Sequence, residues 1–226
     1  MGFFKQKIKN THIIFEAPKT GGTTLRTWIY YYLTGILVKN INYSRGNNYY
    51  TLNGEVTKFL LKNGYSNTGY LKEIIDFNFS AICIVRDPVQ RFLSCFYDKI
   101  IGEHLYKMVG LNNPPNLKEF VNNFSDLIDI REYPSVDDHS KNTLKYHFAP
   151  LTYHYGSNPS IFNKIFWTRQ MNTDIKNYLE DLWGVKLPLI HARNSNRAKE
   201  YENIDNKLRN KIQCLYAIDY DSRFFI

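Results

Sequence analysis

The sequence predicts an α/β fold in which helices flank a central parallel β-sheet. Residues 81–85 form a short, unbroken apolar run that is typical of a strand buried on both faces of such a sheet, and the largely apolar residues 12–17 predict another short buried strand. Each run leads through a polar turn into a segment with helical periodicity, which is the order of a strand–loop–helix unit. No repeat or low-complexity linker interrupts the 226 residues, so we expect a single domain spanning residues 1–226.

The first unit begins with the predicted strand at residues 12–17 (HIIFEA), which is followed by a loop at residues 18–22. A helix is expected to begin near Thr23, because apolar residues then recur at intervals of three and four. These apolar positions share one helical face: Leu25, Trp28, Ile29, Tyr32, Leu33 and Ile36.

The second unit begins with the predicted strand at residues 81–85 (AICIV). Asp87 is suited to cap the following helix, and Pro88 is suited to its first turn. Farther along the chain, Asn116 can cap a short helix, whereas we expect residues 131–160 to be irregular. The remaining predicted elements are a third strand and two helices, over residues 161–167, 173–183 and 203–217.

The composition is that of an ordinary globular protein with a basic surface. The formal net charge of +8 favours an anionic partner, although the charge is dispersed and a solvated basic surface explains it equally well. No apolar run follows the basic residues 1–10, so we expect no signal peptide, no stable membrane insertion and a cytoplasmic protein. Three cysteines that lie far apart predict buried free thiols: Cys83, Cys95 and Cys214.

A candidate phosphate-binding loop lies at residues 18–24 (PKTGGTT). Gly21 and Gly22 let backbone N–H groups approach an anion, and the N-terminus of the following helix adds partial positive charge. Lys19 places a full positive charge at the mouth of the loop. Hydroxyl groups that can donate to phosphate oxygens come from Thr20, Thr23 and Thr24.

The order of residues in this loop differs from that of a Walker A motif, in which the lysine follows the last glycine and precedes a magnesium-ligating Ser or Thr. Here Lys19 precedes both glycines. We therefore expect no metal, because a lysine and backbone donors can stabilise negative charge by themselves. Taken alone, the loop could also be an ordinary Gly-Gly turn with a solvated lysine.

Arg86 is a second candidate for anion binding, because it directly follows the predicted strand at residues 81–85. The carboxyl ends of parallel strands face the ligand crevice, and a guanidinium is a permanent, forked cation suited to phosphate. Ser94 lies two helical turns farther on, on a polar face that it shares with Arg91, so its hydroxyl can reach the same anion. A surface arginine at a helix start is the simpler explanation of this segment alone.

The two segments together resemble a known family. Residues 13–25 (IIFEAPKTGGTTL) and 81–96 (AICIVRDPVQRFLSCF) resemble the signatures by which the sulfotransferase superfamily binds 3′-phosphoadenosine 5′-phosphosulfate (PAPS). The match is closer to the carbohydrate branch, Golgi-type and bacterial, than to the small-phenol branch. The resemblance implies a P-loop-like α/β fold and transfer of a sulfuryl group from PAPS to a hydroxyl, on a saccharide or glycoconjugate.

By the same resemblance, Arg86 and Ser94 bind the 3′-phosphate of PAPS, and Lys19 is catalytic because it neutralises charge on the leaving phosphate oxygen. The loop that holds the 5′-phosphosulfate comprises Pro18, Lys19, Thr20, Gly21, Gly22, Thr23 and Thr24. Looser similarities to the carbohydrate branch occur at residues 147–150 (HFAP), Asn194-Ser195, Tyr216 and Asp219-Tyr220.

The general base that would take the acceptor proton is left open. We prefer His147, which lies in a segment rich in histidine and aromatic residues that suits a sugar-binding wall, and Glu55 is the second candidate. The same segment could equally be packed down by its own aromatic side chains. Glu16 is a further option, although it could also pair with Lys19 or Arg86.

Two other functions are weaker alternatives. A P-loop nucleotide or small-molecule kinase would use Asp87 as a magnesium ligand, but the missing Gly-Lys-Ser/Thr order and the following Pro88 disfavour it. A basic binding module is disfavoured by the dispersed charge and by the lack of any nucleic-acid motif, so we expect no nucleic-acid partner. The acceptor site is expected from residues 38–78 and 102–160, and a basic cluster could attract an anionic acceptor: His191, Arg193, Arg197 and Lys199.

Overall fold

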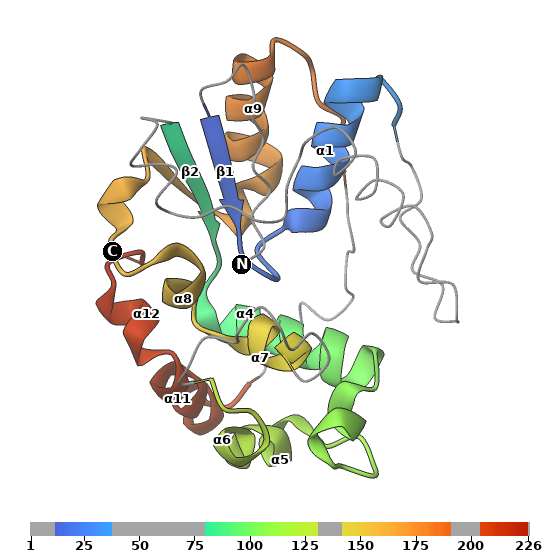
Figure 1. Ribbon diagram of the computed structural model, residues 1–226, viewed down its shortest axis with the longest axis vertical. Coiled ribbons are helices and arrows are strands. Elements are labelled where there is room, and N and C mark those ends of the chain that lie inside the picture. The colour runs from blue at the N-terminus through green and yellow to red at the C-terminus, as the bar shows by residue number, and fades with distance from the viewer. Residues whose placement is uncertain (1–11, 38–79, 131–141, 191–203, 226) are drawn as a thin grey trace. The chain divides into compact units, whose positions relative to one another are not determined.

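The computed structural model describes residues 12–37, 80–130, 142–190 and 204–225 (Figure 1). The chain divides into two compact units, Met1–Val85 with Ile161–Ser195 and Arg86–Ser160 with Asn196–Ile226. The described strands all belong to the first unit, and the described part of the second unit is helical. The single domain that the sequence predicts stays a prediction.

A parallel sheet forms the centre of the first unit. Strands β1 (His12–Glu16), β2 (Ser80–Val85) and β3 (Lys164–Trp167) pair in the order β1-β2-β3. The central strand β2 is buried from residue 81 to residue 85, as expected for a strand covered on both faces. The predicted α/β fold with a parallel sheet is therefore confirmed.

Two helices of the first unit lie beside this sheet, α1 (Gly22–Thr34) and α9 (Lys176–Trp183) (Figure 1). The indole N–H of Trp28 donates to the carbonyl of Pro188 at 2.8 Å. The apolar faces of both helices form one core cluster with the strands, which includes Ile14, Leu25, Trp28, Ile82, Leu179 and Trp183. This burial of amphipathic faces fixes where the loop between β1 and α1 leaves the sheet.

Two irregular helical turns join β3 to α9. They are the 3-10 turn η4 (Thr168–Gln170) and the π-helical turn η5 (Met171–Ile175). The helix predicted to open at residue 173 therefore begins earlier and in non-α geometry, while its end is as predicted, at Gly184 in the left-handed conformation (φ +68°).

The second unit begins with a continuous helical segment. α4 (Pro88–Cys95) continues as the π-helix η1 (Phe96–Gly102), and the predicted caps are confirmed. Asp87 accepts a hydrogen bond from the Gln90 N–H at 2.9 Å, and Asn116 accepts one from the Glu119 N–H at 2.9 Å. Further helical elements of this unit are η2 (Leu105–Val109), α5 (Leu117–Asn122), α6 (Phe124–Leu127), α11 (Asn206–Leu215) and α12 (Ala217–Asp221).

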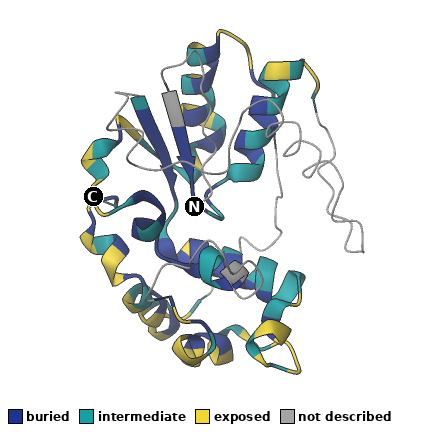
Figure 2. Ribbon diagram, viewed as in Figure 1, coloured by how far each residue is buried: buried dark blue, intermediate teal, exposed yellow. Residues whose placement is uncertain are grey.

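An aromatic core holds these helices together, and its residues are among the dark blue ones in Figure 2. Phe92 of α4 lies at its centre, with its ring 5.2 Å from that of Phe148 and 5.3 Å from that of Phe124. Phe120 and Tyr216 complete the surrounding rings, at 6.0 and 6.3 Å. Edge-to-face packing of this kind stabilises a core beyond the area that it buries.

The expectation that residues 131–160 are irregular is wrong for much of this segment. Residues 142–155 form α7 (Asn142–Phe148) and α8 (Leu151–Tyr155), and η3 (Pro159–Ile161) follows. Phe148 and Tyr155 are fully buried, so tertiary burial stabilises helices that local sequence preference does not reveal. Residues 131–141 lie outside the described residues.

Two further observations concern the cysteines and membranes. Cys83 and Cys95 are buried free thiols, as predicted, whereas Cys214 is exposed on α11 and its predicted burial is wrong. Within the described ranges, none of the helices combines the length and the apolar character that a membrane span requires.

Candidate active site

The loop predicted to bind phosphate connects the end of β1 at Glu16 to the start of α1 at Gly22. It turns tightly, because both the N–H and the hydroxyl of Thr20 donate to the carbonyl of Ala17, at 3.3 and 2.8 Å. Thr20 is fully buried. Its hydroxyl therefore closes the loop internally, which differs from the expected donation to a phosphate oxygen.

Backbone conformation within the loop is unusual at two residues. Gly21 has φ +105°, and Lys19 has φ +69°, a left-handed conformation that costs free energy in a residue with a side chain. Strain of this kind is retained where the surrounding structure and a function require it. Lys19 is half-buried at this turn.

An added side chain at either glycine of the loop would meet a close neighbour. A Cβ atom on Gly21 would lie 2.1 Å from Cε of Met171, and one on Gly22 would lie 2.1 Å from Oε2 of Glu16. A side chain at either position would therefore displace a buried neighbour. Close packing around both positions is found in the structure, and a side-chain-free backbone can let an anion approach. The approach of an anion itself stays a prediction.

The first turn of α1 follows directly. Its first intrahelical bond runs from the Leu25 N–H to the Gly21 carbonyl at 3.2 Å, so the N–H groups of the three preceding residues lack an intrahelical acceptor. Thr23 is half-buried and Thr24 is buried in this turn. The N-terminus of a 13-residue helix thus faces the loop with its partial positive charge.

Glu16 pairs with Arg26 of α1, at 3.1 Å between Oε1 and the guanidinium NH1. Its other oxygen, Oε2, is buried and accepts no hydrogen bond from a described residue. Burial raises the pKa of this carboxyl, and the charge of Arg26 opposes that rise. The sequence suggests Lys19 or Arg86 as its partner, and the ion pair seen in the structure is with Arg26.

Thr168 is a further residue at the loop that the sequence analysis missed. Its hydroxyl oxygen lies 3.2 Å from the carbonyl of Thr20 and 3.0 Å from the carbonyl of Val85. Thr168 directly follows β3 at Trp167, so it stands at the carboxyl end of a parallel strand, as the loop does. That position was the available signal, because such strand ends form ligand sites.

The second predicted group of site residues belongs to the helical unit. Arg86 follows the last residue of β2 and is half-buried, and Ser94 is half-buried on α4. Arg91 does not lie on a separate polar face with Ser94 as expected, because it is fully buried.

Arg91 lies at the centre of a buried polar cluster. The other members come from residues 147–150 and from the C-terminal segment, where the sequence shows its looser similarities to the carbohydrate branch. Its guanidinium donates to the carbonyls of His147, at 3.0 Å, and of Ala149, and it lies 5.6 Å from the ring centre of Tyr216. The Tyr216 hydroxyl donates to the carbonyl of Phe148 at 2.7 Å. The segment at residues 147–150 and the C-terminal tyrosine are thus held together through backbone groups.

Asp219 completes this cluster at the N-terminus of α8. Its carboxylate accepts hydrogen bonds from the N–H groups of Leu151 and Thr152, at 2.9 and 2.8 Å, and from the Thr152 hydroxyl at 3.1 Å. Burial raises the pKa of Asp219, while Arg91 and these hydrogen bonds oppose the rise. The contacts of Arg91, Tyr216 and Asp219 are those of a structural cluster.

The structure describes only one of the two candidates for the general base. His147 is half-buried in α7, with its ring 5.6 Å from that of Tyr146, while Glu55 lies outside the described residues. Burial, with a contribution from Arg91, keeps the pKa of the neighbouring His154 well below its usual range. His154 and Tyr155 are buried, so this part of the predicted sugar-binding wall is core. The basic cluster at residues 191–199 also lies outside the described residues.

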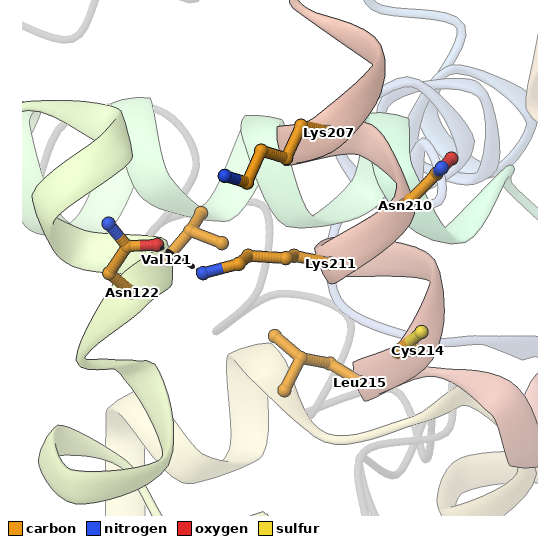
Figure 3. A pocket seen from close by; sticks show the side chains of 7 residues that line it. All are labelled: Val121, Asn122, Lys207, Asn210, Lys211, Cys214 and Leu215. Carbon is orange, nitrogen blue, oxygen red and sulfur yellow. Dashed lines mark hydrogen bonds between the residues drawn. The ribbon is translucent and has the colours of Figure 1, made fainter.

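A groove of about 650 Å³ lies between α5 and α11 (Figure 3). Two lysines of α11 line it, and Lys211 donates to the side-chain carbonyl of Asn122 at 2.7 Å. The groove contains none of the predicted site residues. Its full lining is Val121, Asn122, Lys207, Asn210, Lys211, Cys214 and Leu215.

Comparison with known families identifies one match over nearly the whole chain. A family model described as "Sulfotransferase family" matches residues 7–224. A search of curated proteins found no match. Over the residues that the structure describes, no group of three or more His, Cys, Asp or Glu side chains is arranged to hold a metal ion.

Proposed function

The chain belongs to the sulfotransferase family, whose reaction is the transfer of a sulfuryl group, and we propose that it transfers this group from PAPS to a hydroxyl of a saccharide or glycoconjugate. The observation that carries the proposal is the loop between β1 and α1. It combines two glycines with close neighbours, a lysine held in a left-handed conformation and the N-terminus of a long helix. These features suit a phosphate or phosphosulfate group.

In this proposal the loop holds the 5′-phosphosulfate of the donor. The N–H groups that precede the first intrahelical bond of α1 donate to its oxygens, together with the hydroxyls of Thr23 and Thr24. Arg86 and Ser94 bind the 3′-phosphate, as the family resemblance implies. Pro18, Lys19, Thr20, Gly21 and Gly22 complete the donor site.

The reaction forms one bond and breaks another. The acceptor oxygen attacks the sulfur atom, the bond between sulfur and the bridging phosphate oxygen breaks, and the electron pair stays on adenosine 3′,5′-bisphosphate. Lys19 stabilises the negative charge that develops on this leaving oxygen. A base removes the acceptor proton, for which we propose His147 first and Glu55 second.

The nature of the acceptor rests on the resemblance to the carbohydrate branch. The net charge of +8 suits an anionic glycan, although a basic surface by itself selects no acceptor. We propose no metal, no nucleic-acid partner and no membrane insertion for the reaction. The cytoplasmic location expected from the sequence stays a prediction.

Transfer from radiolabelled PAPS to a panel of glycan, lipid and phenol acceptors tests this function. We expect Lys19→Ala and Arg86→Ala each to reduce turnover at least about a hundredfold while the circular dichroism spectrum is unchanged, because charge stabilisation of a transferring group is worth several kcal/mol. Wild-type turnover in both variants would exclude these residues as donor-binding groups. Stabilisation by ATP with magnesium, and not by adenosine 3′,5′-bisphosphate, would instead favour a kinase.

The same assay, run across pH, tests the base. Loss of the base should remove the acidic limb of the pH–rate profile in His147→Ala or in Glu55→Gln. Full turnover in both variants at every pH would exclude both candidates.

A further inference from the structure

The hydroxyl of Thr168 connects the ends of two strands that flank the candidate site. Its oxygen lies 3.2 Å from the Thr20 carbonyl, in the loop after β1, and 3.0 Å from the Val85 carbonyl, at the end of β2. A hydroxyl carries a single proton, which it can donate to either carbonyl or share between them. One side chain from the end of β3 thus restrains the backbone at the ends of both other strands.

The restraint on Thr20 has a consequence for the neighbouring residue. A trans peptide is planar, so its C=O and its N–H point to opposite sides, and no cis peptide occurs among the described residues. While the Thr20 carbonyl points to Thr168, the Gly21 N–H of the same peptide points away from Thr168. The hydroxyl of Thr168 therefore sets the direction of a loop donor that it does not contact.

Such a restraint is needed because of the residue that follows. Glycine populates positive and negative φ about equally, so a peptide next to glycine can reorient at little steric cost. Gly21 has φ +105°. Loop geometry then depends on hydrogen bonds, and Thr20 is also tied to Ala17 through its own hydroxyl.

Packing from the same segment supports the hydrogen bond. The methyl Cγ2 of Thr168 is 3.8 Å from the position that a Cβ on Gly21 would occupy, and Cε of Met171 is 2.1 Å from it. The start of the connection between β3 and α9 thus lies against the Gly21 backbone. Thr168 supplies the polar contact there and Met171 the apolar one.

We propose that Thr168 is a positioning residue of the donor site, whose hydroxyl orients the Thr20–Gly21 peptide so that the loop can bind the 5′-phosphate of the donor. This role rests on the proposed function. Thr168 contacts the loop backbone, and it acts on the donor through that backbone.

Three variants isolate the hydroxyl. Thr168→Val keeps the shape and loses the hydroxyl, whereas Thr168→Ser keeps the hydroxyl and loses the methyl. Thr173→Val is the matched control, because the Thr173 hydroxyl also donates to a backbone carbonyl, that of Gln170 at 3.2 Å, on an exposed part of the next turn. Two ligands, adenosine 3′,5′-bisphosphate and adenosine 3′-phosphate, are compared by calorimetric titration.

We expect Thr168→Val to weaken binding of the bisphosphate about fivefold, as for the loss of one hydrogen bond, and to leave binding of adenosine 3′-phosphate unchanged. Thr168→Ser and Thr173→Val should bind both ligands as the wild type does. Equal weakening of both ligands in Thr168→Val, or the same loss in Thr168→Ser, would overturn the proposal.

Hydrogen exchange of the ligand-free protein supplies a readout that does not depend on the donor. We expect faster exchange of the amides of residues 20–24 in Thr168→Val than in the wild type or in Thr168→Ser. Unchanged exchange would refute the positioning role even if PAPS proves to be the donor. If the variants differ in exchange as expected but the wild-type protein binds neither ligand, the positioning role stands and the proposed function is refuted.

Discussion

The loop at residues 17–22 and the polar cluster around Arg91 both bring charge and backbone hydrogen-bonding groups together, with opposite outcomes. In the cluster, the guanidinium of Arg91 and the carboxylate of Asp219 are fully buried and bonded to backbone groups of residues 147–152. In the loop, Lys19 is half-buried in a strained conformation beside helix N–H groups that lack an intrahelical acceptor. Charges bonded within the fold stabilise it, whereas a strained loop at a helix N-terminus suits an anionic ligand.

The largest effect is expected from breaking the cluster. Asp219→Ala leaves two buried N–H groups of α8 without their acceptor and removes a buried carboxyl that interacts with Arg91, so we expect a loss of about 3–5 kcal/mol in the free energy of unfolding, measured by urea denaturation. Asp221→Ala is the control, because Asp221 is exposed on the same helix α12, and it should change stability by less than about 0.5 kcal/mol. Similar losses in the two variants would remove the distinction between cluster and surface.

An intermediate effect is expected from a side chain in the loop. Gly22→Ala forces a methyl group against the carboxylate of Glu16, which its pairing with Arg26 keeps in place, so we expect a stability loss of about 1–3 kcal/mol and loss of bisphosphate binding. Gly35→Ala provides the contrast, since Gly35 lies at the other end of α1, at positive φ, and has no atom within 4 Å of an added Cβ. It should cost about 1 kcal/mol through backbone strain alone and leave binding intact. Intact bisphosphate binding in Gly22→Ala would mean that the loop is not the donor site.

The smallest effect is expected from neutralising Glu16. Its pKa is raised in the folded state, so the folded protein holds this proton more tightly than the unfolded chain, and the contribution of Glu16 to stability is greatest at acidic pH and falls as pH rises through the folded-state pKa. Glu16→Gln removes that dependence. We expect the free energy of unfolding of the variant, relative to that of the wild type, to increase as pH rises above about 4, the usual pKa of a glutamate, measured by urea denaturation at each pH. A relative gain in the opposite direction would show that the pairing with Arg26 outweighs burial.

Local sequence signals predicted much of the fold and of the loop. The caps at Asp87 and Asn116 depend on atoms a few residues apart, and the turn at Gly21 depends on the absence of a side chain. Lys19 was assigned correctly to the loop, but its positive φ was not foreseen, because a lysine offers no signal for it.

Tertiary burial decided the secondary structure of segments in which helical periodicity is weak. Residues 142–155 are expected to be irregular from sequence but form α7 and α8, because Phe148 packs into an aromatic core assembled from distant helices and Tyr155 is fully buried against Phe224. The same core buries Arg91, which helical periodicity alone had placed on a polar face with Ser94. A charged residue at such a position becomes interpretable only when its acceptors, 56 and 58 residues away, are known.

By itself the sequence determined the parallel α/β class and the position of the glycine-containing loop between the first strand and the first helix, because strand runs, caps and glycines act through short-range sterics and hydrogen bonds. Tertiary structure alone decided that Glu16 pairs with Arg26, that Asp219 caps α8 and that Thr168 restrains the loop. The last contact joins residues 148 positions apart, and no local preference specifies such a pair. It exists because the pairing of β1, β2 and β3 brings the ends of the three strands to one edge of the sheet.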